Sequence, residues 1–131
     1  MLQPGLSKEL TFSVTDALTA KTVGSGTLAV LATPILIARM EEAAWTCVAP
    51  HLAEGESTVG TLMNLKHLSP TPVGMEVTCR AELTQADGRR LVFHVTAQDG
   101  QGLVGEGTHE RALIQNERFL TKAQKKLAGS R

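Results

Sequence analysis

The second half of the chain carries one long series of alternating apolar and polar residues, broken only at short turn sequences. The alternating stretches are Ser57 to Leu68, Glu76 to Thr84, Arg89 to Gln98 and Leu103 to Ile114. Alternation with a period of two is typical of strands that bury one face. Asp87-Gly88 is a strong hairpin signal between the second and third stretches. Four strands joined this closely predict an antiparallel sheet.

A single long helical segment precedes these strands. Thr33-Pro34 opens it, because threonine is a good N-cap and proline fits the first helical position, and it runs to about Ala49. A strand is predicted from Glu9 to Thr15, a loop from Thr22 to Gly26, and a short C-terminal helix from Asn116. The absence of βαβ alternation argues against a doubly wound nucleotide-binding fold.

These elements predict an α+β protein in which one long helix is wrapped by a single antiparallel sheet. Its 131 residues suit one domain with one core, so we assign residues 1–131 to one domain and expect a loose tail at 127–131. Only four residues are aromatic, so the core is expected to be aliphatic. Cys47 and Cys79 are isolated among apolar or small neighbours, which favours buried free thiols over a disulfide.

Charge and motifs exclude several classes of protein. Thirteen basic residues balance thirteen acidic ones, whereas a nucleic-acid-binding protein needs a clustered positive excess. The longest apolar run, 28–40, is interrupted and too short to span a bilayer, and no secretory signal is visible. We therefore expect a cytoplasmic protein with no membrane partner. No Cys/His cluster has metal-ligand spacing and no phosphate-binding loop occurs, so we expect no metal and no other cofactor.

Glu41 occupies an unusual position on the predicted helix. At about 100° per residue, Arg39, Glu42 and Thr46 form one polar stripe, and Glu41 falls nearly opposite, beside Ile37. A carboxylate on an apolar face is expected to be paired, to bind metal or to be catalytic. The alternative is a solvated position or a salt bridge. Glu42 serves as a comparison, because it can simply pair with Arg39.

A histidine stands out in the first strand of the series. Its more apolar parity contains Val59, Thr61, Met63, Leu65 and His67. If that parity faces the helix, His67 points inward, either as a satisfied core residue or as a group that exchanges protons near neutral pH. Thr33, besides capping, could stabilise negative charge at the helix start. His109, in the polar group 108–111, could hold a sheet edge or a subunit contact.

Several of these residues together resemble one family. Ala32-Thr33, Met40-Glu41 eight residues later, Lys66-His67 and the closing Gly107-Thr108-His109-Glu110-Arg111-Ala112 resemble hot-dog fold thioesterases of the fluoroacetyl-CoA thioesterase type. The resemblance covers roughly residues 29–125. It implies a hot-dog fold, a homodimer or dimer of dimers, and hydrolysis of an acyl-CoA or similar pantetheine thioester. It also implies a catalytic set of Thr33, Glu41 and His67, with the backbone N–H of Gly60 near the substrate carbonyl.

One segment departs from that family. The fluoroacetate-specific enzyme has a longer, aromatic-bearing lid before its catalytic threonine, whereas Thr19 to Leu31 is short here and contains no aromatic residue. We therefore expect a different small or medium acyl group. Scattered cations near strand ends could contact the CoA phosphates, although solvated positions are favoured for them: Lys66, Arg80, Arg89 and Arg90.

Two other functions fit the same residues. A hot-dog enoyl-thioester hydratase would also use a carboxylate and a histidine to activate water, but it would release no free thiol. A non-catalytic acyl-ligand-binding protein would keep Glu41 and His67 as a structural pair. Because fold alone does not fix chemistry, hydrolysis is the preferred prediction and these two are its alternatives.

Overall fold

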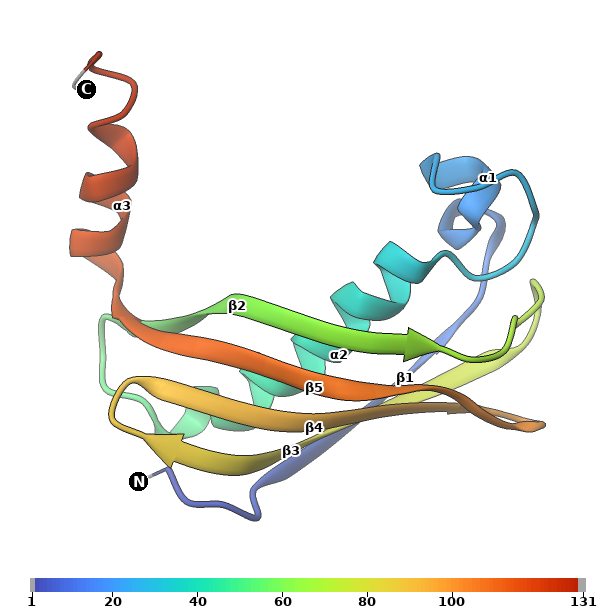
Figure 1. The fold of residues 1–131 in the computed structure, drawn as a ribbon, viewed down its shortest axis with the longest axis horizontal. Coiled ribbons are helices and arrows are strands. Elements are labelled where there is room, and N and C mark those ends of the chain that lie inside the picture. Colours follow the sequence, from blue (N-terminus) through green and yellow to red (C-terminus); the bar gives the residue numbers. More distant parts are fainter. Residues whose placement is uncertain (1, 130–131) are drawn as a thin grey trace.

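The computed structural model describes residues 2–129 and contains one five-stranded sheet with a long helix across one face (Figure 1). The elements in chain order are β1 (Ser7–Ser13), α1 (Ala20–Val23), α2 (Thr33–Val48), β2 (Glu56–His67), β3 (Glu76–Asp87), β4 (Arg90–Asp99), β5 (Gly102–Gln115) and α3 (Asn116–Gln124), with short 3-10 turns at Asp16–Leu18 and Ala49–His51. The strand order is β1-β3-β4-β5-β2, and every pair is antiparallel. The predicted α+β class is confirmed.

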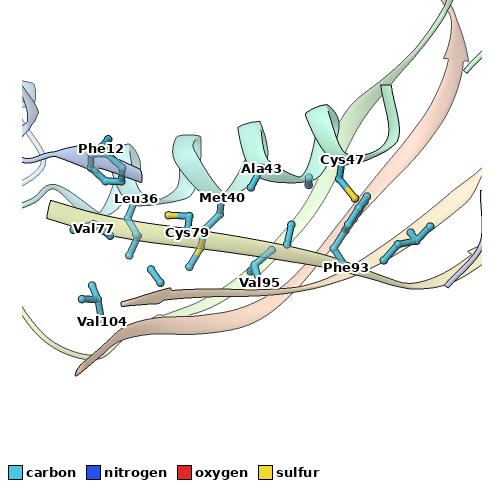
Figure 2. Close-up of a cluster of buried hydrophobic side chains, with 14 of the residues drawn as sticks. Phe12, Leu36, Met40, Ala43, Cys47, Val77, Cys79, Phe93, Val95 and Val104 are labelled. Atoms are coloured by element: carbon cyan, nitrogen blue, oxygen red, sulfur yellow. The ribbon is translucent and has the colours of Figure 1, made fainter. Parts of the chain in front are cut away.

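Helix α2 and the inner face of the sheet form the hydrophobic core (Figure 2). Leu36, Met40, Ala43 and Cys47 repeat every three or four residues along α2 and are buried. They pack against Phe12 of β1 and against the inward side chains of the central strands β3 and β4, which are Val77, Cys79, Ala81, Leu83, Leu91, Phe93, Val95 and Ala97. The core is therefore mainly aliphatic, as predicted, and both cysteines are free thiols inside it.

The start of α2 differs from the prediction in one respect. Ala32, not Thr33, occupies the N-cap position, and no side chain caps the helix. Thr33 is the first helical residue, and Pro34 follows it within the first turn, where a missing N–H costs nothing. The hydroxyl of Thr33 is therefore available for a contact outside the helix.

The segment before α2 contains a short helix that the sequence did not predict. Residues Ala20–Val23 form α1, capped at its start by the Thr19 side chain and ended by Gly24 at a φ of 86°. Glycine reaches this left-handed conformation without the steric cost that other residues meet. In Figure 1, α1 lies beside the N-terminal end of α2. None of its residues is buried.

Strand β2 contains a bulge that changes which side chains face the helix. The pairing with β5 shifts between Gly60 and Leu62, so Thr61 has no direct partner across the ladder. A bulge of one residue inverts the alternation of side chains. Residues 58 and 60 therefore face inward before the bulge, and Met63, Leu65 and His67 face inward after it. The prediction that Val59 and Thr61 share the face of His67 is wrong for this reason.

The β2 edge of the sheet and helix α3 lie at the periphery of the fold. Strand β2 is an edge strand of 12 residues, and its outer side pairs with no other strand among residues 2–129. Helix α3 projects away from the sheet (Figure 1), with Phe119 and Leu120 exposed. The predicted loose tail, 127–131, ends outside the described residues. Within 2–129, no helix is long and apolar enough to cross a membrane.

Candidate active site

Thr33 and His67, two of the predicted catalytic residues, are in direct contact. The hydroxyl Oγ1 of Thr33 lies 2.7 Å from Nδ1 of His67, which is a hydrogen-bond distance. The first turn of α2 supplies the threonine and the last residue of β2 supplies the histidine. The contact exists because the helix starts next to the point at which β2 ends.

The other ring nitrogen of His67 has no such neighbour. Its Nε2 atom is buried and is without a hydrogen-bond partner among residues 2–129. Burial lowers the pKa of His67 below its ordinary value, and the backbone of Ser69 partly opposes this effect. The neutral imidazole is therefore favoured near pH 7, with a nitrogen able to accept or donate a proton.

Glu41 lies at the margin of the apolar face of α2 and not at its centre. Its side chain is 41% exposed, while the neighbouring Met40 and Ala44 are fully buried. The helical-wheel prediction therefore placed Glu41 too deep. Glu42, used as the comparison, pairs with Arg39 at 3.1 Å as predicted.

Gly60 faces the Glu41 carboxylate directly. A Cβ atom built on Gly60 would fall 2.6 Å from Oε2 of Glu41 and 3.4 Å from Nη1 of Arg111. No side chain larger than hydrogen fits there without moving the carboxylate. The absent side chain of Gly60 thus makes room for Glu41 beside the strand backbone.

Two residues of β5 complete this second cluster, and the sequence reasoning did not assign them to the site. Arg111 is 6% exposed and its Nη1 lies 3.7 Å from Oε2 of Glu41. His109 is 1% exposed and contacts Arg111 through Nε2 at 3.1 Å. The polar group at 108–111 is therefore not a subunit contact or a sheet edge at these two positions. The pairing of β4 with β5 is the signal that would have indicated them, because Arg111 and His109 lie opposite the inward-facing Leu91 and Phe93.

Within one chain the site consists of two separate groups. Thr33 and His67 form one, while Glu41, Gly60, His109 and Arg111 form the other. At 1.5 Å per residue, the eight residues from Thr33 to Glu41 span about 12 Å along the helix. No hydrogen bond or ion pair joins the two groups among the described residues.

A groove of about 460 Å³ lies next to the second group. Its lining residues come from the end of α2, the following turn, the start of β2 and β5, and they are Trp45, Ala49, Leu52, Glu56, Ser57, Thr58 and Arg111. Trp45 is 46% exposed and is the one aromatic side chain among these lining residues. Because Arg111 also faces Glu41, the groove reaches the carboxylate cluster.

The cations predicted as possible phosphate contacts are mostly engaged with other groups. Arg80 pairs with Glu82, and Arg90 pairs with Glu110. Arg89 donates from Nε to the backbone carbonyl of Leu113. In the described part of the chain, no group of three or more His, Cys, Asp or Glu side chains is placed to hold a metal ion.

Comparison with known proteins supports the resemblance drawn from the sequence. Residues 14–117 match the family described as fluoroacetyl-CoA-specific thioesterase. The fluoroacetyl-CoA thioesterase of Streptantibioticus cattleyicolor is 44% identical over 100 residues, which cover 74% of this chain and 70% of that protein.

Solved structures agree with the fold. A structure of the fluoroacetyl-CoA thioesterase FlK superposes with a TM-score of 0.92 at 35% identity, over 96% of this chain and 98% of that one. A hot-dog-like protein from Thermanaerovibrio acidaminovorans gives 0.87 at 21% identity over 95% and 93%, which speaks for the fold alone. The predicted hot-dog fold is confirmed, and hydrolysis is favoured over the two alternatives. The chain belongs to the family of fluoroacetyl-CoA-specific thioesterases, which are thioester hydrolases.

Proposed function

We propose that this chain hydrolyses acyl-CoA thioesters with Glu41, Thr33 and His67 as its catalytic residues. The observation that carries the proposal is the Glu41 carboxylate, held against the glycine backbone at Gly60 and the buried cation Arg111 while remaining open to water. A carboxylate in that position can activate a water molecule for attack on a carbonyl. The net reaction yields a carboxylic acid and free CoA thiol.

The residues divide the chemical steps between them. The Glu41 carboxylate removes a proton from water as the C–O bond forms, and the carbonyl oxygen becomes an oxyanion. The Thr33 hydroxyl and the Gly60 N–H donate hydrogen bonds to that oxygen. When the C–S bond breaks, the proton that Glu41 took from water passes through Nε2 of His67 to the departing thiolate, so that the carboxylate and the neutral imidazole are both restored. A direct attack by Glu41 on the carbonyl is the alternative route, in which a mixed anhydride forms as the CoA thiolate leaves. Water that attacks the glutamyl carbonyl of this anhydride would place solvent ¹⁸O in the Glu41 side chain during a single turnover, which the general-base route cannot do.

We also propose that two chains combine to complete each site. An antiparallel pairing of two β2 edges centred on Asn64, with Thr61 bulged out of each strand, would set Gly60 opposite His67 of the partner subunit. The two groups, separated along one helix, would then meet across the two-fold axis. The unpaired 12-residue outer edge of β2 supports this arrangement, because long exposed edges are usually covered.

The acyl group we propose is larger than fluoroacetyl, in the small to medium range. Helix α1 buries no side chain, and the segment from Thr19 to Leu31 contains no aromatic residue that could close over a small substrate. The groove beside Arg111 offers an apolar wall at Trp45 instead. An acyl chain of several carbons would remove part of that wall from water.

The test of the assignment is Glu41→Gln with Glu42→Gln as its matched control. The amide keeps the size of Glu41 but cannot act as a base, so kcat for acyl-CoA hydrolysis should fall about 10²–10⁴-fold. Glu42→Gln, which loses only a half-exposed pair with Arg39, should keep normal kcat. A folded Glu41→Gln protein with full thiol release would sink the assignment.

The shared site has its own test, in which Glu41→Gln and His67→Gln proteins are mixed and allowed to exchange subunits. If each site uses Glu41 from one chain and His67 from the other, a mixed dimer has one intact site. Random exchange should then restore about a quarter of the wild-type activity. Sites contained within single chains would leave the mixture inactive.

A further inference from the structure

The imidazole of His109 is buried and held in one protonation state by two hydrogen bonds. Its Nδ1 lies 2.8 Å from the carbonyl oxygen of Leu62, and its Nε2 lies 3.1 Å from Nη1 of Arg111. A carbonyl can only accept and a guanidinium can only donate. Nδ1 therefore carries the hydrogen, and Nε2 accepts from Arg111 through its lone pair. The ring is neutral and its tautomer is fixed.

Nε2 of His109 accepts a hydrogen bond from Arg111 and so helps to hold its guanidinium in one orientation. At its other side, the guanidinium donates from Nε to the hydroxyl of Thr58 at 2.8 Å and from Nη2 to the Thr58 carbonyl at 3.0 Å. A planar guanidinium bonded at both edges cannot rotate freely. Its Nη1 is thereby held 3.7 Å from Oε2 of Glu41.

The Nδ1–H group of His109 donates to strand β2, on the other side of the Glu41 carboxylate from Arg111. Leu62 is the first residue after the β2 bulge that regains a partner on β5. Its carbonyl, bound by His109, fixes the strand immediately after the bulge. That bulge is what turns Gly60 toward Glu41 while Met63 also faces inward. One imidazole thus bonds both structures that flank the Glu41 carboxylate.

We propose that His109 is a positioning residue for hydrolysis, holding the Arg111 guanidinium and the bulged strand in register with Glu41. This inference rests on the proposed role of Glu41. Burial keeps the pKa of His109 below its usual value, with Arg111 acting in the same direction, so the accepting lone pair persists near neutral pH. The ring of Phe93, 6.1 Å away between centroids, supports its orientation.

Three substitutions separate the two hydrogen bonds. His109→Gln can place an amide oxygen near the position of Nε2 and keep an acceptor for Arg111. His109→Asn can place an amide nitrogen near the position of Nδ1 and keep the donor to Leu62. His109→Phe keeps the ring but removes both bonds. Each variant is measured for kcat and KM with one acyl-CoA substrate, and for Tm.

The proposal expects kcat of His109→Phe to fall about 10–100-fold with little change in KM, since a carboxylate displaced by about 1 Å loses catalysis before binding. His109→Gln and His109→Asn should each recover part of that kcat. If His109→Phe does not fold, the other two variants decide, and each should have a kcat at least about threefold below wild type.

Three results would overturn the proposal. One is a wild-type kcat in His109→Phe, or in both amide variants if the phenylalanine variant is unfolded. Another is a rise in KM with kcat unchanged. The third is a loss of kcat that follows Tm equally in all variants, which would indicate packing alone. Glu41→Gln distinguishes the two hypotheses, because an active Glu41→Gln enzyme removes the proposed function itself.

Discussion

Gly60 and Glu41 approach so closely that the hydrogen of the glycine is the only side chain compatible with the observed carboxylate position. The Cβ of an alanine would lie 2.6 Å from Oε2 of Glu41, below any normal contact distance. Gly60 is not among the residues with positive φ, so it is required by this approach and not by its backbone conformation. The position of the Glu41 carboxylate on α2 therefore depends on the β2 bulge, which turns Gly60 toward it.

Gly60→Ala should therefore lower activity much more than stability. The atom that must move is the end of a flexible side chain, so the fold can survive while the carboxylate shifts. We expect kcat to fall about 10–100-fold, as for a misplaced catalytic group. Gly100→Ala is the matched control, because nothing lies within 4 Å of its added Cβ and its φ is not positive. Equal kcat values in the two variants would contradict the assigned role of Gly60.

Thr33→Val should remove the hydroxyl that contacts His67 while keeping the shape of the side chain. Losing one oxyanion donor typically lowers kcat about 10²–10³-fold, and Thr33→Ser should restore much of the activity because it keeps the hydroxyl. Helix stability should change little, since Thr33 makes no cap hydrogen bond. The measurement is steady-state thiol release with Tm in parallel. A valine variant as active as the serine variant would exclude Thr33 from catalysis.

The architecture followed from periodicity, since alternation and helical spacing report directly on which face of an element is buried. The bulge at Thr61 did not, because a single extra residue depends on pairing with β5 and leaves no local signature. For that reason the predicted inward face of β2 failed at Val59 but held at His67. The capping prediction for Thr33 failed because the helix began one residue earlier than capping preference suggested.

Four of the six residues of the candidate site were named from the sequence, and the other two depended on tertiary register. Glu41 and His67 stood out because each breaks the polarity pattern of its own element. His109 and Arg111 did not, since their strand mixes charged and apolar residues on both faces. Their burial and their positions opposite Phe93 and Leu91 show that both side chains enter the interior.

Trp45→Ala should change the preference for acyl chain length. If the acyl group lies in the groove next to Arg111, losing the indole removes apolar contact in proportion to the length of the chain. We expect kcat/KM for a hexanoyl or phenylacetyl thioester to fall about tenfold, while that for acetyl-CoA stays within about twofold. Phe119→Ala, at an exposed position on α3, is the control. A uniform loss across the acyl panel would place the acyl group elsewhere.

The buried imidazole of His109 should make stability depend on pH below neutrality. Burial, reinforced by Arg111, lowers the pKa of His109, while the Leu62 carbonyl and Glu41 oppose this shift. The native state then binds fewer protons than the unfolded state, whose histidines titrate near pH 6.5. The contribution of neutral His109 to the free energy of unfolding is complete above that pH. It is lost as pH falls toward the native pKa, and the free energy of unfolding then changes by at most about 1.4 kcal/mol per pH unit. Urea unfolding between pH 7.5 and 5.0 should show a shallower decline for His109→Gln than for wild type, and identical slopes would contradict a buried neutral imidazole.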